Sequence, residues 1–372
     1  MQTPVPLDCG TGWFFKMNKG DSTMKKQNVV VVALLLCVAV AVFNDSANAQ
    51  NKRTGTAAAP ELLIPVGARD LAMGGATIAS SVGIESIYWN PAGLGRIKSS
   101  AEGMFSNMSY IADIGVNYGA VAASFGDFGV LGLSVKSLNF GNIPLTTEDD
   151  PENFSGRFYS PAYVTVGISY SRALTDAISF GGTVKIVSEQ IDRVSASAFA
   201  LDIGVQYNRL AGISGLSLGV VVKNIGPQMK FSGPGLYRVA VSSDGSRPAQ
   251  RYSSEASSSE LPSLVEIGLA YSGMAADNLS YSVDGSFQNN NLYLDSYNVG
   301  GELGFSMQQF KIFGRAGMGF IPQADANTNI FGATFGGGIN YAATGVDITI
   351  DYAYRQVDFF DANNVFSVKF GF

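Results

Sequence analysis

Apolar side chains occupy every second position at the C-terminal end of the chain. Phe366, Val368, Phe370 and Phe372 alternate with small or polar residues, Ser367, Lys369 and Gly371 among them. A period of two indicates a β-strand with one apolar and one polar face. The same alternation recurs upstream, which predicts that much of the preceding chain also forms β-strands.

Fourteen segments from residue 101 onward read as strands of about 11–15 residues. They are 101–111, 114–126, 127–140, 159–173, 177–191, 196–209, 215–226, 261–273, 277–288, 295–306, 310–321, 330–342, 345–357 and 362–372. A strand of about 9–11 residues crosses a bilayer. In 345–357, Val346, Ile348 and Ile350 share one face, whereas Asp347 and Asp351 share the other. We place the apolar face toward lipid and the carboxylates toward a lumen.

The predicted fold is therefore all-β, a transmembrane antiparallel β-barrel of about 14 strands over residues 101–372. A terminal strand that ends on an aromatic residue resembles the closing strand of bacterial outer-membrane barrels. The long connections, 141–158, 227–260 and 322–329, all join an odd strand to the next even one. Outer-membrane barrels have short periplasmic turns and longer external loops, whereas a soluble sandwich or propeller predicts no such segregation. We expect a multi-pass protein of the bacterial outer membrane, with outer-membrane lipid as its surroundings.

The N-terminal region reads as a secretory signal. Lys25 and Lys26 precede an apolar run over 29–43, and Ala47-Asn48-Ala49 is a small-x-small cleavage signal. Residues 24–49 are thus a predicted signal peptide, and 1–23 an upstream extension translated in error. Residues 50–60 are small and polar and predict a flexible periplasmic leader.

The amino-acid composition excludes several classes of function. Charged residues make up only 15% of the chain, which has 44 glycines, 16 tyrosines and 24 phenylalanines; roughly a quarter charged is usual for soluble domains. The chain has no His, and both cysteines precede residue 50. His-based catalysis and a His- or Cys-ligated zinc site are therefore excluded. A net charge of −6 offers no basic surface for nucleic acid. We expect no enzyme and no cofactor.

One of the predicted external loops is acidic. It contains Glu148, Asp149, Asp150 and Glu152. We predict a solvated acidic loop here, with a Ca²⁺ site as the alternative.

Residues 61–100 are glycine-rich and have no clean strand pattern. Three elements stand out in the 67–95 stretch. They are Gly67-Ala68-Arg69, Met73-Gly74-Gly75-Ala76 and Tyr88-Trp89-Asn90-Pro91-Ala92-Gly93-Leu94. This combination resembles the N-terminal signature of the PorV/PorQ family, a branch of the FadL-like fourteen-stranded outer-membrane barrels. Gly75 and the Gly93-Leu94 pair depart from the pattern of the secretion component itself, which leaves open a paralogous role.

The residues of this segment also predict its structure independently of the family resemblance. Asn90-Pro91 initiates a turn, because Pro91 has a fixed φ and restricts the residue before it. Gly74-Gly75 permits a positive φ or a close backbone approach. Arg69 is expected to face inward carboxylates such as Asp347 and Asp351. A barrel of fourteen strands is too wide for its own side chains to fill, so we predict that 61–100 folds into the lumen as a hatch. A periplasmic segment beneath the barrel is the alternative.

The family resemblance implies a non-enzymatic accessory role in type IX protein secretion. Such proteins bind the C-terminal signal domains of cargo or lie beside the large translocon barrel. We expect the 141–158 and 227–260 loops to make these contacts. Their candidate apolar anchors are Phe154, Phe158, Tyr159, Phe231, Leu236 and Tyr237. The alternative function is FadL-like transport of a hydrophobic ligand, which predicts an apolar pocket at the external end of the lumen. A general diffusion porin is disfavoured by the hatch.

Overall fold

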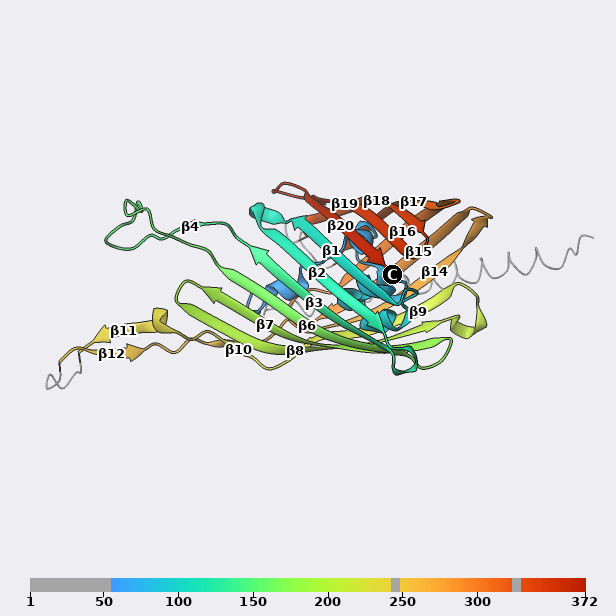
Figure 1. Ribbon diagram of the computed structural model, residues 1–372. Helices are drawn as coiled ribbons and strands as arrows, with labels where there is room; N and C mark the ends of the chain where they lie inside the picture. The colour runs from blue at the N-terminus through green and yellow to red at the C-terminus, as the bar shows by residue number, and fades with distance from the viewer. Residues whose placement is uncertain (1–54, 242–247, 323–328) are drawn as a thin grey trace, which may run out of the picture. The chain divides into compact units, whose positions relative to one another are not determined.

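The computed structural model describes residues 55–241, 248–322 and 329–372, and fourteen of their strands form a closed antiparallel barrel in chain order (Figure 1). The barrel strands are β1 (Ala101–Ser109), β2 (Gly115–Ser124), β3 (Val130–Asn139), β6 (Ala162–Ala173), β7 (Ile178–Ile191), β8 (Val194–Asn208), β9 (Leu216–Ile225), β14 (Leu264–Ala276), β15 (Leu279–Asn290), β16 (Ser296–Met307), β17 (Phe310–Phe320), β18 (Phe331–Ala343), β19 (Val346–Val357) and β20 (Asn363–Gly371). Each coincides with one of the predicted segments, so the fold class is confirmed.

The last strand closes the barrel by pairing with the first. In this register Phe105 lies opposite Val368, and Asn107 lies opposite Phe366. Phe366, Phe370 and Phe372 are exposed on the outer surface, whereas Ser367 is buried toward the lumen. The other strands follow the same rule, because exposed aliphatic and aromatic side chains alternate with buried polar ones. The predicted orientation, apolar face outward, is therefore confirmed.

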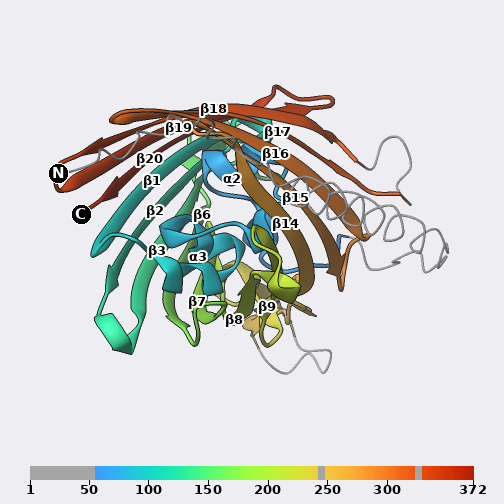
Figure 2. The same ribbon diagram turned by 90° about the vertical axis from the view of Figure 1, so that its right-hand side faces the viewer.

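Short helices fill the lumen. They are η1 (Pro60–Leu63), α2 (Ala68–Ala72), η2 (Thr77–Ala79), η3 (Gly83–Glu85), α3 (Ser86–Trp89) and η4 (Pro91–Arg96). We call residues 58–97 the hatch. Figure 2 shows α2 and α3 enclosed by the strands. The hatch backbone lies so close to β16 and β17 at Met73 that a Cβ at Gly300 or Gly317 would collide with it. The predicted luminal hatch is thus present, and the alternative of a segment beneath the barrel is wrong.

The hatch runs the whole length of the lumen. At one end Ala58 N donates to Glu260 O at 2.9 Å, at the base of the 226–263 connection. At the other end Ser100 N donates to Phe372 O at 2.7 Å, beside the chain terminus. Ala58 and Ala59 are buried with Leu62 against the ends of β7 and β8. Ala58 and Ala59 are therefore packed at the end of the barrel with the long connections, whereas the sequence predicts a flexible periplasmic leader over residues 50–60.

The long connections contain structure of their own. They hold three two-stranded antiparallel pairs: β4 (Ile143–Pro144) with β5 (Phe158–Tyr159), β10 (Met229–Lys230) with β13 (Ser258–Ser259), and β11 (Tyr237–Ala240) with β12 (Gln250–Ser253). Further 3-10 turns are η5 (Ile111–Asp113), η6 (Gly126–Phe128), η7 (Leu210–Gly212) and η8 (Pro234–Leu236). The β4–β5 and β11–β12 pairs extend beyond the same end of the barrel (Figure 1).

The predicted extension over 1–23, the signal peptide over 24–49 and the first residues of the leader lie outside the described residues. None of the helices in the described ranges is long and apolar enough to cross a membrane.

Candidate functional site

Two glycines set the course of the hatch next to the barrel wall. Gly74 and Gly75 have φ values of 68° and 76°, which L side chains rarely adopt. A Cβ on Gly74 would lie 2.7 Å from the backbone nitrogen of Met318 in β17. A Cβ on Gly75 would lie 3.0 Å from the Trp89 ring. The pair therefore combines a left-handed turn with close approach, as its sequence suggested. Met73 before it is fully buried.

Asn90 joins the hatch to itself and to the wall. Its backbone is extended, and its side-chain oxygen accepts from Ala92 N at 3.2 Å, which caps η4 with Pro91 in the first turn. Its amide nitrogen donates to Ile78 O at 2.9 Å and to Val205 O of β8 at 3.2 Å. One side chain thus holds η2, η4 and the barrel together.

Trp89 and Tyr88 form the apolar centre of the hatch. The Trp89 indole nitrogen donates to Val66 O at 3.1 Å, and its ring packs with Ile78 and Val221. The Tyr88 ring meets Trp89 edge-on, with centroids 5.2 Å apart. Lys223 lies 5.1 Å from the Tyr88 centroid, a cation–π arrangement. The Gly67 and Gly93 positions lie at turns of the same segment, before α2 and within η4.

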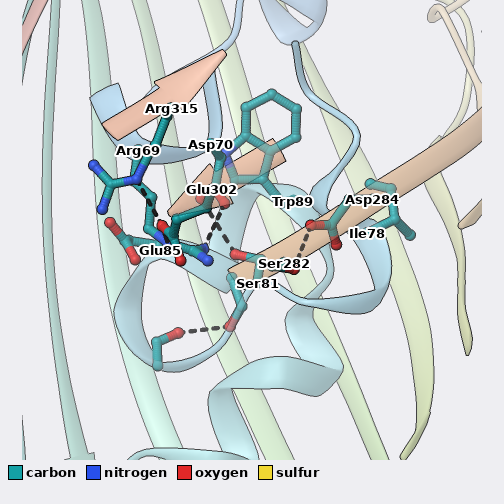
Figure 3. A network of polar contacts seen from close by, with 12 residues as sticks. Arg69, Asp70, Ile78, Ser81, Glu85, Trp89, Ser282, Asp284, Glu302 and Arg315 are labelled. Atoms are coloured by element: carbon teal, nitrogen blue, oxygen red, sulfur yellow. Dashed lines mark hydrogen bonds and ion pairs between the residues drawn. The ribbon is translucent and has the colours of Figure 1, made fainter. Parts of the chain in front are cut away.

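A charged network ties α2 to the wall (Figure 3). Arg69 Nε contacts Glu302 at 3.2 Å, and Arg315 Nε contacts the same carboxylate at 2.6 Å. Arg315 Nη1 reaches Asp351 at 2.5 Å. Arg69 therefore meets a luminal carboxylate as expected, but the expected partners are wrong. Arg315 pairs with Asp351, and Asp347 accepts from Asn340 instead.

Asp70 completes the hatch side of this network. Arg69 Nη1 lies 3.0 Å from its carboxylate, and the Ser81 hydroxyl donates to it at 3.3 Å. Burial raises the pKa of Asp70 to about 6 although Arg69 opposes the shift. The network contains two cations, Arg69 and Arg315, and three carboxylates, so most of its charge is compensated by direct ion pairs. We read it as the attachment of the hatch rather than as a catalytic arrangement.

Glu61 is a second buried acid, at the opposite end of the hatch. Its side chain is 1% exposed. Burial, and then the neighbouring Glu189, raise the pKa of Glu61 to about 8. The cation nearest to it, Lys136, donates instead to the backbone oxygens of Glu61 and Ile64, at 2.6 and 3.2 Å. Burial therefore favours the protonated form of Glu61.

A cavity of about 420 Å³ lies between the hatch and the wall. On the hatch side it is lined by η1 and by the Tyr88–Trp89 pair. On the wall side it reaches Lys223, Glu266 and Arg355. Tyr110 and Tyr293, from connections that join odd to even strands, also line it, so the cavity lies toward the external end. Its volume falls within the roughly 300–1,000 Å³ of small-molecule sites.

The predicted loop anchors divide into two groups. Phe154 is 90% exposed at the tip of the 140–161 connection, and Phe158 is 58% exposed on β5. Tyr159 is partly buried and pairs with Ile143, while Tyr237 is exposed on β11. Phe231 instead packs against the cluster that contains Met229, and Leu236 is partly buried. Phe231 thus contributes to the attachment of its loop.

Asp150 organises the loop tip that presents Phe154. Its carboxylate accepts from Phe154 N at 2.7 Å and from Ser155 N at 2.9 Å. The hydrogen bonds from Ser155, and then from Phe154, lower the pKa of Asp150. The acidic loop is thus held by its own backbone. No group of three or more His, Cys, Asp or Glu within the described ranges could hold a metal ion.

Comparison with protein families identifies the chain. The family described as type IX secretion system protein PorV matches residues 47–240, more than half of the sequence. The chain belongs to the PorV family. The match covers the predicted hatch motifs and the first seven barrel strands of this PorV-family protein. No curated protein sequence matches the chain.

Solved structures with the same fold support the barrel. The toluene transporter TbuX of Ralstonia pickettii superimposes with a TM-score of 0.50 and 13% identity, over 83% of this chain and 98% of that one. The toluene transporter TodX of Pseudomonas putida gives a TM-score of 0.50 and 12% identity, over 83% of this chain and 99% of that one. This PorV-family protein therefore has a FadL-like outer-membrane barrel fold, and its localisation is the outer membrane.

Two features of the site were missed from the sequence. Glu302 and Arg315 lie on strands whose alternation turns them inward, but nothing in the sequence says that β16 and β17 meet the hatch at α2. Arg355 lies on the same face of β19 as Asp347 and Asp351, which the alternation turns toward the lumen, yet its place in a cavity depends on how η1 and Phe331 pack beside it.

Proposed function

We propose that this PorV-family barrel is a non-enzymatic accessory component of type IX protein secretion. It binds the folded C-terminal signal domains of cargo, or the translocon barrel, through the connections that contain β4–β5 and β11–β12. The lumen remains filled by the hatch, so the barrel offers its external surface to proteins instead of a passage for them.

The exposed apolar side chains of these connections carry the proposal. Phe154 and Phe158 extend from one hairpin, and Tyr237, Val239 and Tyr252 from the other. Both hairpins lie beyond the barrel strands, outside the zone that lipid would cover (Figure 1). Exposed apolar residues beyond the lipid zone are typical of protein interaction sites. The β11 and β12 edges also carry unpaired backbone groups that another strand can extend.

Replacement of the anchors tests the proposal. Phe154→Asp with Phe158→Asp, and Val239→Asp with Tyr252→Asp, should each reduce secretion of cargo with a type IX signal domain, while the barrel still reaches the outer membrane. Val121→Thr on the lipid-facing surface of β2 is the control for an altered exposed apolar residue. Unchanged secretion in all hairpin variants would contradict the proposed contact.

A second function, passage of a hydrophobic small molecule, is favoured by the cavity of about 420 Å³ at the external end of the lumen. The structural relatives named above are toluene transporters, which gives this alternative a precedent in the fold. Uptake of labelled toluene by cells with and without the protein tests it. Equal uptake would remove this alternative and leave the accessory role untouched.

A further inference from the structure

A second cavity in the lumen is small and polar. Its volume is about 30 Å³, and it lies between the hatch and the strands β2, β3, β6, β7 and β8. The wall lines it with hydroxyl and charged side chains, which are Tyr118, Ser134, Lys136, Thr165, Thr183, Lys185 and Asp202. One buried water needs about 10–15 Å³. The cavity is therefore large enough for one monatomic ion or about two water molecules.

The lining of this cavity has one more cation than it has anions. Lys185 pairs with Asp202 at 2.8 Å. Lys136 is only 5% exposed, and among the described residues no carboxylate lies within ion-pair distance of it. Its ammonium donates to the backbone oxygens of Glu61 and Ile64, which leaves one of its three N–H groups. A buried cation without a counter-charge is costly unless a ligand supplies one.

Neighbouring groups do not supply the missing negative charge. The Tyr88 ring lies with its centroid 5.0 Å from the Lys136 ammonium, a contact that compensates only part of a full charge. Burial, and then Glu189, raise the pKa of Glu61 to about 8, so the carboxyl group of Glu61 favours its neutral form. The Asp202 carboxylate is already engaged by Lys185.

Two hydroxyl groups of the lining lack hydrogen-bond partners within the described part of the chain. They are Tyr118 Oη and Thr165 Oγ1, on residues that are 4% and 7% exposed. The Thr183 hydroxyl, in contrast, already bonds to Ser169 at 2.7 Å. Buried polar groups nearly always have a partner, so two unpartnered hydroxyls beside one cavity point to a ligand inside it. Hydroxyl and ammonium groups can both donate to an anion.

We propose that this cavity binds a single chloride ion, held by the Lys136 ammonium and by the hydroxyl groups of Tyr118 and Thr165. These donors come from three adjacent strands, β3, β2 and β6. The same ammonium bonds to the backbone of the hatch at Glu61 and Ile64, so the ion stabilises the contact of η1 with the wall. A volume of about 30 Å³ excludes a large polyatomic anion.

The melting temperature of the purified mature protein in an uncharged detergent tests the site. Sodium chloride is titrated against sodium gluconate at constant total sodium, because gluconate is too large for the cavity. We expect a saturable rise of about 2 °C or more that chloride causes and gluconate does not. Lys136→Met should abolish this rise, because it removes the charge that the anion compensates.

Lys311→Met is the matched control, because Lys311 is an exposed cation at the start of β17. It should keep the full chloride-dependent rise, which separates the cavity from surface charges that salt screens.

Thr165→Val removes one donor without leaving a charge unpaired, so it decides the question if Lys136→Met does not fold. It should need about tenfold more chloride for half of the rise, the size of one hydrogen bond to a charged group. Equal responses of the wild type to chloride and gluconate, as expected for a cavity that holds only water, would overturn the proposal. So would a wild-type chloride response in Lys136→Met or in Thr165→Val.

Discussion

At the scale of single residues, the hatch depends on positions where no side chain fits. Gly74 turns the chain at a positive φ and at the same point touches the backbone of Met318. The sequence allowed this reading, because a glycine pair permits both conformations. The sequence did not identify Met318 as the residue that Gly74 contacts. Met318 lies more than two hundred residues away along the chain, and the two meet only when the barrel has closed around the hatch.

Gly74→Ala should therefore destabilise the protein. The added Cβ would lie 2.7 Å from a backbone atom that cannot rotate away, at a φ of 68°. We expect a loss of about 2 kcal/mol or more, from strain and displacement of the hatch. The measurement is the melting temperature of the purified barrel in detergent.

Gly314→Ala is the matched control. Gly314 lies on β17, as does Met318, the residue that Gly74 contacts. No atom lies within 4 Å of a Cβ added to Gly314. Its melting temperature should stay near that of the wild type. If both variants melt alike, close approach at Gly74 does not hold the hatch.

Charge pairs form the second residue-scale contribution. Arg315 has two carboxylate partners, Glu302 and Asp351, whereas Arg69 shares Glu302 with it. Arg315→Met should cost about 3–5 kcal/mol, because Asp351 is left buried without a cation. Adding Asp351→Leu to Arg315→Met should restore part of that loss in unfolding measurements. No restoration in the double variant would show that the two residues act separately.

At the scale of elements, the period-two pattern predicted all fourteen barrel strands but not the structured loops. Each barrel strand has one face in lipid and one in the lumen, so its alternation is strong. The β11–β12 ribbon has all its residues exposed, and therefore no burial imposes a pattern on them. The path of the hatch could not be predicted either. Residue 58 lies at the external end because it packs against β7 and β8, and no pattern in the sequence around it indicates these contacts.

The pKa of Glu61 predicts a pH dependence for this end of the hatch. The folded pKa of about 8 lies above the ordinary value of 4.5, so the folded state keeps a proton that the unfolded state loses. The contribution of Glu61 to stability should be highest below about pH 4.5, fall between pH 4.5 and 8, and stay level above. Glu61→Gln should remove this contribution, so the melting temperature of the variant relative to the wild type should rise from pH 5 to pH 8.

Asp150→Asn is the control for a carboxylate outside the lumen. Asp150 is exposed in a loop, and its pKa is lowered instead of raised. A wild-type slope that persists unchanged in Glu61→Gln would mean that another group is responsible.

The direction of the hatch can be tested by labelling. Residues 50–372 contain no cysteine, so one introduced thiol gives a clean signal. Thr56 is exposed next to the base of the 226–263 connection, because Ala58 bonds to Glu260. Thr56→Cys should react with a membrane-impermeant maleimide on intact cells. Thr175→Cys, in the turn between β6 and β7 at the opposite end, should react only after lysis, and the reverse result would invert the assigned direction.

At the scale of the whole molecule, the protein is a closed barrel with the hatch in its lumen. Its external hairpins, β4–β5 and β11–β12, extend beyond the barrel (Figure 1). Charged residues of the wall pair within the lumen, as Lys185 does with Asp202 and Lys223 with Glu266. Phe154 and Phe158 of one hairpin and Val239 and Tyr252 of the other are exposed. Membership in the PorV family and the position of these hairpins together support the proposed role as an accessory barrel that acts through protein contacts at the cell surface.

The most direct test of this account is affinity purification of the mature protein from its native outer membrane in mild detergent, followed by mass spectrometry of the associated proteins. We predict recovery of a large translocon barrel or of cargo with type IX signal domains, and loss of that partner from the Phe154→Asp, Phe158→Asp double variant. Recovery of the barrel alone, with the wild-type protein intact and folded, would contradict the account.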